Sequence, residues 1–176
     1  MLHWLWSMMC VGVLVSKSLG KVLDVIHMGH PTLSMPAKRV DDPTSPQIGV
    51  VVRDMMATIA SMGGGAGLAA PQVNIPLQIF IFCIPSDRAE DGVGLPLTPV
   101  INPVIEHKSD KIVLGWEGCF SLPGVMGEVP RHETITYQFQ ALTGEVERRT
   151  VSGLHARIVQ HETDHLEGVL YVERIR

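Results

Sequence analysis

The chain has 176 residues, of which 45% are hydrophobic and 18% are charged, and this composition lies far from that of disordered chains. A chain of this length buries roughly two thirds of the surface that it exposes when unfolded, so one packed domain is expected. The net charge of −4 comes from 14 basic and 18 acidic residues without a dense basic run. Direct binding to nucleic acid is therefore not expected.

The first 20 residues form an apolar extension whose role the sequence leaves open. Its apolar stretch, from Trp4 to Val15, is about a dozen residues long, shorter than the roughly 20 that a helix needs to cross a bilayer. No Lys or Arg precedes that stretch, as one would in a secretory signal, and the first arginine is Arg39. A removable leader, a misassigned start and a buried strand stay open. We predict no membrane span and one catalytic domain over residues 21–176.

The three cysteines, Cys10, Cys83 and Cys119, are too few and too scattered for a disulfide framework. Their odd number leaves at least one thiol unpaired, which favours a reducing compartment. We therefore predict a cytoplasmic protein, or an organellar one if residues 1–20 are a removable leader.

A first helix is predicted after position 45. Apolar residues there recur at intervals of three and four, as in one stripe of an amphipathic helix: Ile48, Val51, Val52, Met55, Met56 and Ile59. Ser45 can cap this helix, Pro46 suits its first turn, and Gly63 can end it.

The rest of the chain reads as short strands and one further helix. Segments rich in β-branched and aromatic residues predict strands over 78–84, 100–107, 111–116, 134–140 and 145–151, the last two joined by a turn at Thr143-Gly144. A second helix is predicted over 154–166, with Ser152 as its cap and Gly168 past its end. This order indicates an α+β fold, in which antiparallel strands pack around the central second helix.

The second helix contains the sequence His161-Glu162-Thr163-Asp164-His165. Positions four apart lie about 40° apart around a helix, so both imidazoles project from one face, and Glu162 lies about 60° from His165. Two imidazoles beside a carboxylate can bind a divalent metal and activate a water for hydrolysis. The alternative is a chance spacing on a solvated helix, which is uncommon because histidine is rare.

A catalytic metal site needs a third protein ligand and an open position for water. Only eleven residues follow His165, and Glu167 and Glu173 are the carboxylates among them. Upstream, Cys119 lies between a predicted strand and a Pro-Gly turn, where a bend can present a thiolate. A lone cysteine is more often a small core residue, but the flanking Gly118 and Glu117, in a chain that also carries the histidine pattern, favour Cys119 as the third ligand.

A run of small residues, Gly63-Gly64-Gly65-Ala66-Gly67-Leu68-Ala69-Ala70-Pro71-Gln72, follows the first helix. No strand precedes it, so a phosphate cradle is not expected. Small residues let the backbone approach a ligand closely, and Gln72 can donate an amide hydrogen bond to a developing oxyanion. A flexible loop from helix to strand is the alternative.

Together these motifs resemble, in the same order, the three motifs of the peptide deformylases. The matching segments are Gly65–Gln72, Glu117–Ser121 and His161–His165, and Met28–Leu33 is similar to the family's N-terminal motif. The resemblance covers residues 22–172. It implies hydrolytic removal of the formyl group from the formyl-methionine of nascent polypeptides, which are the expected partners, with release of formate.

By this resemblance, Cys119, His161 and His165 would hold the metal and Glu162 would be the general acid and base. Gln72 and the backbone N–H of Phe120 would form the oxyanion hole. The resemblance favours Fe²⁺, with Zn²⁺ as the common substitute, because thiolate and imidazole suit both ions.

A slot for the methionine side chain would lie beside the metal. Leu154 and Ile158 lie on the same helical side as His161, and Ala66 and Gly67 would come from the glycine-rich segment. Leu154 and Ile158 fit plain core positions equally well. Metal ligands need outer hydrogen-bond partners, and the pair of Glu117 and Arg131 is one candidate.

Some positions depart from the commonest family pattern, among them Phe120, Ala66, Gly124 and Met126, so peptide contacts beyond methionine are not specified. The chain stops at Arg176, without room for the C-terminal helix through which some bacterial members contact ribosomes, so ribosome contact by that route has little support. A zinc endopeptidase and a non-enzymatic binding module on the same fold are the alternative functions.

Overall fold

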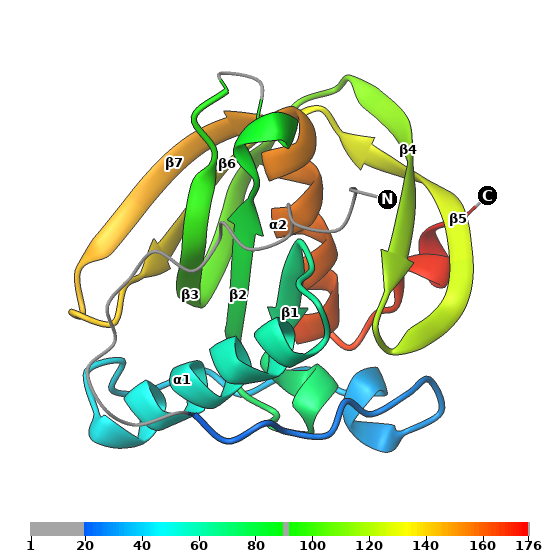
Figure 1. The fold of residues 1–176 in the computed structure, drawn as a ribbon. Helices are drawn as coiled ribbons and strands as arrows, with labels where there is room; N and C mark the ends of the chain where they lie inside the picture. Colours follow the sequence, from blue (N-terminus) through cyan, green and yellow to red (C-terminus); the bar gives the residue numbers. More distant parts are fainter. Residues whose placement is uncertain (1–19, 90–91, 176) are drawn as a thin grey trace, which may run out of the picture.

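The computed structural model describes residues 20–89 and 92–175 and contains two separate antiparallel sheets (Figure 1). The larger sheet has the strand order β1 (Gly67–Ala69), β2 (Ile79–Ile84), β3 (Leu95–Lys108), β6 (Thr134–Gln140) and β7 (Val146–Ser152). The smaller sheet is a hairpin of β4 (Ile112–Cys119) and β5 (Leu122–His132). Apart from Gly20, the predicted N-terminal extension lies outside the described residues. The α+β class and the antiparallel arrangement in a single domain are confirmed.

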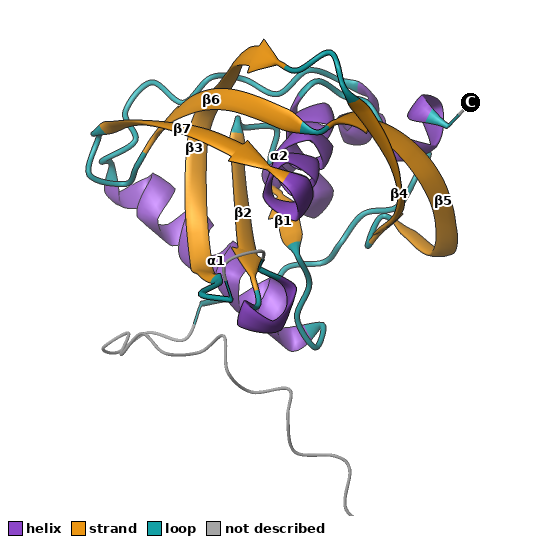
Figure 2. Ribbon diagram, turned by 90° about the horizontal axis from the view of Figure 1, so that it is seen from above, coloured by secondary structure: helices purple, strands orange, loops and turns teal. Residues whose placement is uncertain are grey.

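Helix α2 (Gly153–Leu166) lies between the larger sheet and the β4–β5 hairpin, as the view from above also shows (Figure 2). It contacts β1, β2, β6 and β7 on one side and β5 on the other. Because α2 packs against the hairpin, side chains of the hairpin can meet side chains of the helix.

Strand β2 forms the centre of the core because both of its faces are buried. Phe80 and Phe82 pack in the cluster that contains Ile158 and Val159 of α2. Ile79 and Ile81 point to the other face and pack in the cluster that contains Met55 and other residues of α1 (Pro46–Ser61). Successive side chains of a strand face opposite sides, so a strand covered by helices on both faces reads as an unbroken apolar run.

Both helices were predicted within one or two residues of their ends. The apolar stripe of α1 is buried through Ile48, Val52, Met55 and Ile59. Ser45 and Ser152 occupy the N-cap positions, but neither side chain caps its helix with a hydrogen bond. Gly63 and Gly168, which follow the two helices, have φ of +81° and +76°, where glycine carries no steric penalty.

Two strands were not predicted. Strand β5 contains Pro123, Gly124, Gly127 and Pro130, residues that usually interrupt strands, but it pairs with β4 along most of its length. Strand β1 arises inside the glycine-rich run, where Gly67–Ala69 pair with β2. The alternative of a flexible loop is therefore wrong over those three residues. None of the described helices has the length and apolar character needed to cross a membrane.

Candidate metal centre

Three ligand-type side chains from the hairpin and from α2 converge on one point. Cys119 lies at the end of β4, and His161 and His165 lie four residues apart on α2. One ligand atom from each residue lies within 4.8 Å of the other two, and Cys119 Sγ is 3.2 Å from His165 Nε2. One thiolate and two imidazoles are a donor set that divalent transition metals bind. The donor set and its spacing therefore fit a metal ion.

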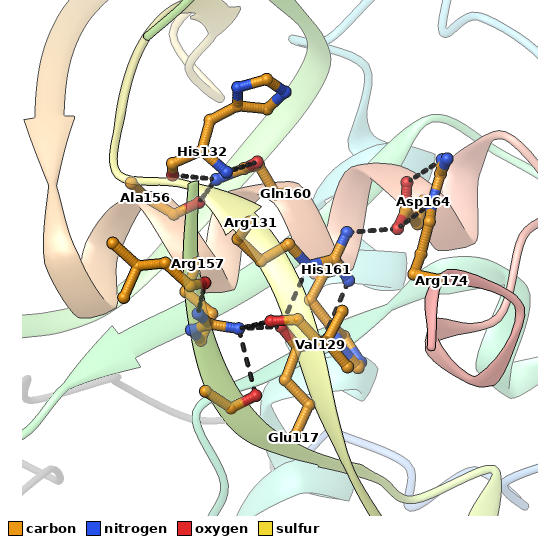
Figure 3. Close-up of polar contacts among 12 residues, drawn as sticks. Glu117, Val129, Arg131, His132, Ala156, Arg157, Gln160, His161, Asp164 and Arg174 are labelled. Atoms are coloured by element: carbon orange, nitrogen blue, oxygen red, sulfur yellow. Dashed lines mark hydrogen bonds and ion pairs between the residues drawn. The ribbon is translucent and has the colours of Figure 1, made fainter. Parts of the chain in front are cut away.

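The carboxylate of Glu117 orients the first of these histidines (Figure 3). His161 Nδ1 is 2.8 Å from Glu117 Oε2, so its Nε2 is the ring nitrogen left to face the cysteine. Arg131 donates two hydrogen bonds to the same carboxylate, at 2.9 and 3.0 Å, as the sequence led us to expect. Partners of this kind fix the ring orientation of metal-binding histidines.

A network of charges extends from Glu117 across α2. Arg131 also pairs with Asp164, and Arg174 donates to Asp164 at 2.8 Å. Glu117, Arg131 and Asp164 are all buried, so each charge needs a partner. Sequence reasoning missed Asp164, although it lies inside the histidine motif, because an acid on a helix usually faces solvent.

Tyr171 covers the other side of His161. It belongs to the short helix η4 (Tyr171–Arg174), and its ring stacks on the imidazole with centroids 5.8 Å apart. Its hydroxyl donates to the carbonyl of Val125 in β5 at 3.0 Å. Tyr171 thus contacts both the ligand helix and the ligand hairpin, a role that its sequence position did not indicate.

Glu162 is buried against the glycine-rich segment, and its Oε2 has no hydrogen-bond partner among the described residues. Burial raises the pKa of Glu162 to about 7. A carboxyl group that titrates near neutrality can both accept and donate a proton at physiological pH. Glu162 lies on α2, one residue after His161.

Gln72 is held with its amide nitrogen toward the trio. Its Oε1 accepts the backbone N–H of Ala69 at 2.8 Å, which leaves Nε2 to donate to Cys119 Sγ and to Ser121 Oγ, both at 3.2 Å. Because Oε1 must face an N–H donor, the network fixes the orientation of the amide. Ser121, which follows the cysteine by two residues, was not singled out from the sequence.

Three of the four residues expected to form the methionine slot belong to one core cluster or pack against it. Ile158 is buried in the cluster between α2 and the larger sheet, and Ala66 and Leu154 pack against that cluster. Phe120 belongs to the turn between β4 and β5, and its ring lies over Gly65, where an added β-carbon would be 2.5 Å from Phe120 Cζ. Phe120 therefore closes one side of the glycine-rich segment.

The charges around the trio act on the ionisation of its neighbours. Burial alone would raise the pKa of Glu117, but hydrogen bonds from His161 and Arg131 outweigh it and lower the pKa to about 2. Glu117 is therefore a carboxylate throughout the physiological range. Burial lowers the pKa of His165, which favours the neutral imidazole that metals bind.

A cavity of about 390 Å³ lies on another side of α2, away from the trio. Gln160, Thr163, Asp164 and Glu167 contribute to its wall, but none of the three ligand residues does. Its polar lining contrasts with the apolar slot expected for a methionine side chain. The chemistry of the trio, rather than cavity size, therefore locates the candidate site.

Comparison with known proteins identifies the family. The model of the polypeptide deformylase family matches residues 22–176. The chain belongs to the polypeptide deformylases. It is 45% identical to peptide deformylase 1 of Nitrosomonas europaea and 44% identical to peptide deformylase 1 of Bordetella pertussis, in each case over 86% of both chains.

Solved deformylase structures share the fold. A Met-Ala-Ser-bound class I type b peptide deformylase from Acinetobacter baumannii is 37% identical, with a TM-score of 0.80 over 88% of this chain and 98% of the other. An actinonin complex of the Synechococcus elongatus deformylase is 36% identical, with a TM-score of 0.78 over 93% of this chain and 86% of the other. Deformylases are metalloenzymes and hydrolases that act on formylated nascent peptides, and Cys119, His161 and His165 form the candidate metal site in this member.

Proposed function

We propose that this chain hydrolyses the formyl group of formyl-methionyl peptides and releases formate, with a metal held by Cys119, His161 and His165. The observation that carries the proposal is the convergence of these three ligand atoms, with the buried carboxyl group of Glu162 on the same helix as the two histidines. The Acinetobacter relative binds Met-Ala-Ser, which supports a peptide that begins with methionine as the substrate class. Residues 21–176 would form the catalytic domain.

The metal supplies Lewis acidity, which lowers the pKa of a water from about 15.7 toward neutrality and polarises a carbonyl oxygen. The soft thiolate with two imidazoles suits both Fe²⁺ and Zn²⁺. We propose Fe²⁺ as the native ion, with Zn²⁺ as a substitute.

Glu162 moves the proton. Its carboxylate accepts a proton from the water that attacks the formyl carbon and delivers that proton to the departing amine. Burial, the raised pKa of about 7 and the unpartnered Oε2 support this role, because no group in the described part of the chain hydrogen-bonds to that oxygen. Cleavage of the C–N bond then yields formate and a free N-terminal methionine.

Gln72 and the backbone N–H of Phe120 would stabilise the negative oxygen of the tetrahedral intermediate. Gln72 Nε2 is already oriented toward Cys119 by the bond between its Oε1 and Ala69. A donor that is fixed before the reaction needs no reorganisation, and the loss of one such donor costs about 2.7–4 kcal/mol in enzymes where it was measured.

The methionine side chain would lie in an apolar slot formed by Ala66, Gly67, Leu154 and Ile158. The packing of Ala66 and Leu154 against the cluster that contains Ile158 supports this assignment. A formyl carbon carries only hydrogen, so a narrow site admits a formyl group and excludes larger acyl groups.

Formate release tests the proposal. The protein is loaded with Fe²⁺ under anaerobic conditions and incubated separately with formyl-Met-Ala and with acetyl-Met-Ala. The release of formate and of acetate is then measured. We expect turnover of the formyl peptide alone, and loss of that turnover in Glu162→Gln. The matched control is Glu145→Gln at an exposed turn, which should behave as the unaltered chain. Equal rates on both peptides, cleavage of internal peptide bonds, or full activity of Glu162→Gln would refute the proposal.

A further inference from the structure

The candidate metal centre joins two parts of the fold that share no sheet. Cys119 belongs to the β4–β5 hairpin and the two histidines belong to α2. The distance between the sulfur and the imidazoles therefore depends on how the hairpin is held against the helix. The backbone ladder of the larger sheet does not fix this distance, because the hairpin is not part of that sheet.

Arg157 contacts both strands of the hairpin across this junction (Figure 3). It lies on α2 one turn before His161, and its side chain is only 15% exposed. Its guanidinium donates to the carbonyls of Val113 and Gly115 in β4, at 2.7 and 3.3 Å, and to the carbonyl of Val129 in β5 at 2.9 Å. One helix side chain thus binds the backbones of both strands of the hairpin.

Arg157 also binds the carboxylate that orients His161. It donates to Glu117 Oε1 at 2.8 Å, and that oxygen accepts its other bond from Arg131 Nε. Glu117 Oε2 accepts from Arg131 and from His161. The four acceptor positions of the carboxylate are filled by these donors. Removal of Arg157 would free one position and let the carboxylate turn away from the imidazole.

The hairpin is shaped to receive this guanidinium. A β-carbon added to Gly115 would lie 2.8 Å from Arg157 Cζ, a distance that the planar group cannot accept without moving. The φ angle of Gly115 is not positive. Close approach of Arg157, rather than backbone conformation, therefore accounts for glycine at this position.

We propose that Arg157 is a positioning residue that fixes the hairpin to α2 and so sets the placement of Cys119 and the orientation of His161. The inference rests on the proposed function, in which these residues hold the metal. Arg157 touches neither the substrate nor the metal in this scheme. It acts through Glu117 and through the strand carbonyls, and lysine cannot replace it fully because a single ammonium lacks the fork of donors.

Cobalt binding separates positioning from simple structural support. The metal-free full-length protein is titrated with Co²⁺ against a competing chelator, and the thiolate-to-cobalt absorption per bound ion is recorded. We expect Arg157→Met to weaken Co²⁺ affinity by about 10- to 100-fold, as partners of metal ligands do when lost, and to reduce the thiolate absorption. Arg157→Lys should recover part of both, and Gly115→Ala should shift both in the same direction as Arg157→Met.

Arg148→Met is the matched control, because Arg148 pairs with Glu106 on the exposed part of the larger sheet. It should leave the affinity and the absorption unchanged. A lower unfolding midpoint of Arg157→Met with unchanged affinity and absorption would overturn the inference. If Arg157→Met does not fold, unchanged cobalt binding in both Gly115→Ala and Arg157→Lys would overturn it equally.

The two proposals fail in different ways. If the unaltered protein binds Co²⁺ without thiolate absorption, the ligand set of the proposed function is wrong, and the role of Arg157 falls with it. If the unaltered protein shows the absorption and releases formate, while the Arg157 and Gly115 variants bind cobalt as it does, only the role of Arg157 is refuted.

Discussion

Gly67 and Glu162 are packed so closely that a β-carbon on Gly67 would overlap the carboxyl group of Glu162. Gly67 begins β1 and Glu162 lies on α2, so the contact joins the glycine-rich segment to the histidine helix. Gly67 does not have a positive φ. A β-carbon at this position would therefore have to displace the carboxyl group of Glu162.

Gly67→Ala should displace Glu162 and reduce deformylation. A misplacement of about 1 Å can cost roughly 100-fold in rate, so we expect kcat/KM for formyl-Met-Ala to fall by about that factor. The measurement is formate release with the metal content of each sample checked. Unchanged kcat/KM in a fully loaded variant would show that the carboxyl group can work from another position.

Gly49→Ala should stabilise the protein. Gly49 lies in α1, and a β-carbon there meets nothing within 4 Å. Replacing glycine by alanine inside a helix gains roughly 0.5–1 kcal/mol, because the unfolded chain loses freedom. Urea unfolding should therefore show a higher midpoint with the same slope. Formate release should be unaffected, which makes Gly49→Ala a glycine control for Gly67→Ala.

Cys119→Ser should lose both bound metal and activity. A hydroxyl is a far weaker ligand for Fe²⁺ or Zn²⁺ than a thiolate, because it is not deprotonated at neutral pH. Cys83→Ala is the control, since Cys83 is buried in β2 and belongs to no ligand trio in the described part of the chain. Metal analysis after dialysis decides the matter, and one equivalent of metal retained by Cys119→Ser would contradict the ligand assignment.

The stability of the fold should depend on the charge state of His155. Burial and the charge of Arg149 lower its pKa from 6.5 to about 4, and its Nε2 lies 3.0 Å from the hydroxyl of Tyr137. Below pH 6.5 the unfolded chain binds a proton at His155 that the folded chain does not. Stability is therefore lost as the pH falls from 6.5 toward 4, by less than the roughly 3.4 kcal/mol that the full difference gives at 1.36 kcal/mol per pKa unit, because His155 is only partly buried and solvent screens its charge.

His155→Gln removes this contribution. Urea unfolding of both proteins at several pH values between 7.5 and 4 should give a difference in stability that shrinks as the medium becomes more acidic. Other acids and histidines titrate in both proteins, so the difference isolates His155. A constant difference across the range would mean that folding does not lower the pKa of His155.

Sequence periodicity predicted the elements that carry the candidate site. The spacing of His161 and His165 required a helix to place both rings on one face, and α2 does so. The apolar stripe of α1 was predicted for the same reason, since burial on one side leaves a regular pattern. By contrast, β5 was missed because Pro130 and several glycines mask a strand whose pairing partner lies elsewhere in the chain.

The contacts that surround the trio were harder to predict than the trio itself. An arginine on a helix, such as Arg157, usually extends into solvent, and nothing local to it shows that a hairpin 40 residues earlier will cover it. The pair of Glu117 and Arg131 could be predicted only because Glu117 lies two residues before the ligand Cys119. Tyr171 and Asp164 gained their roles from packing between distant segments, which residue spacing does not encode.

Because the hairpin and α2 both supply metal ligands, metal binding should restrict the opening of the hairpin away from the helix. Cys119 and His165 are 46 residues apart in the chain, so an ion that binds both acts as a removable crosslink. Hydrogen exchange should report its removal locally. Chelation should speed the exchange of amides in β4 and β5 and leave those of β2 and β3 protected, because the latter are held by the hydrogen bonds of the larger sheet and by apolar packing on both faces.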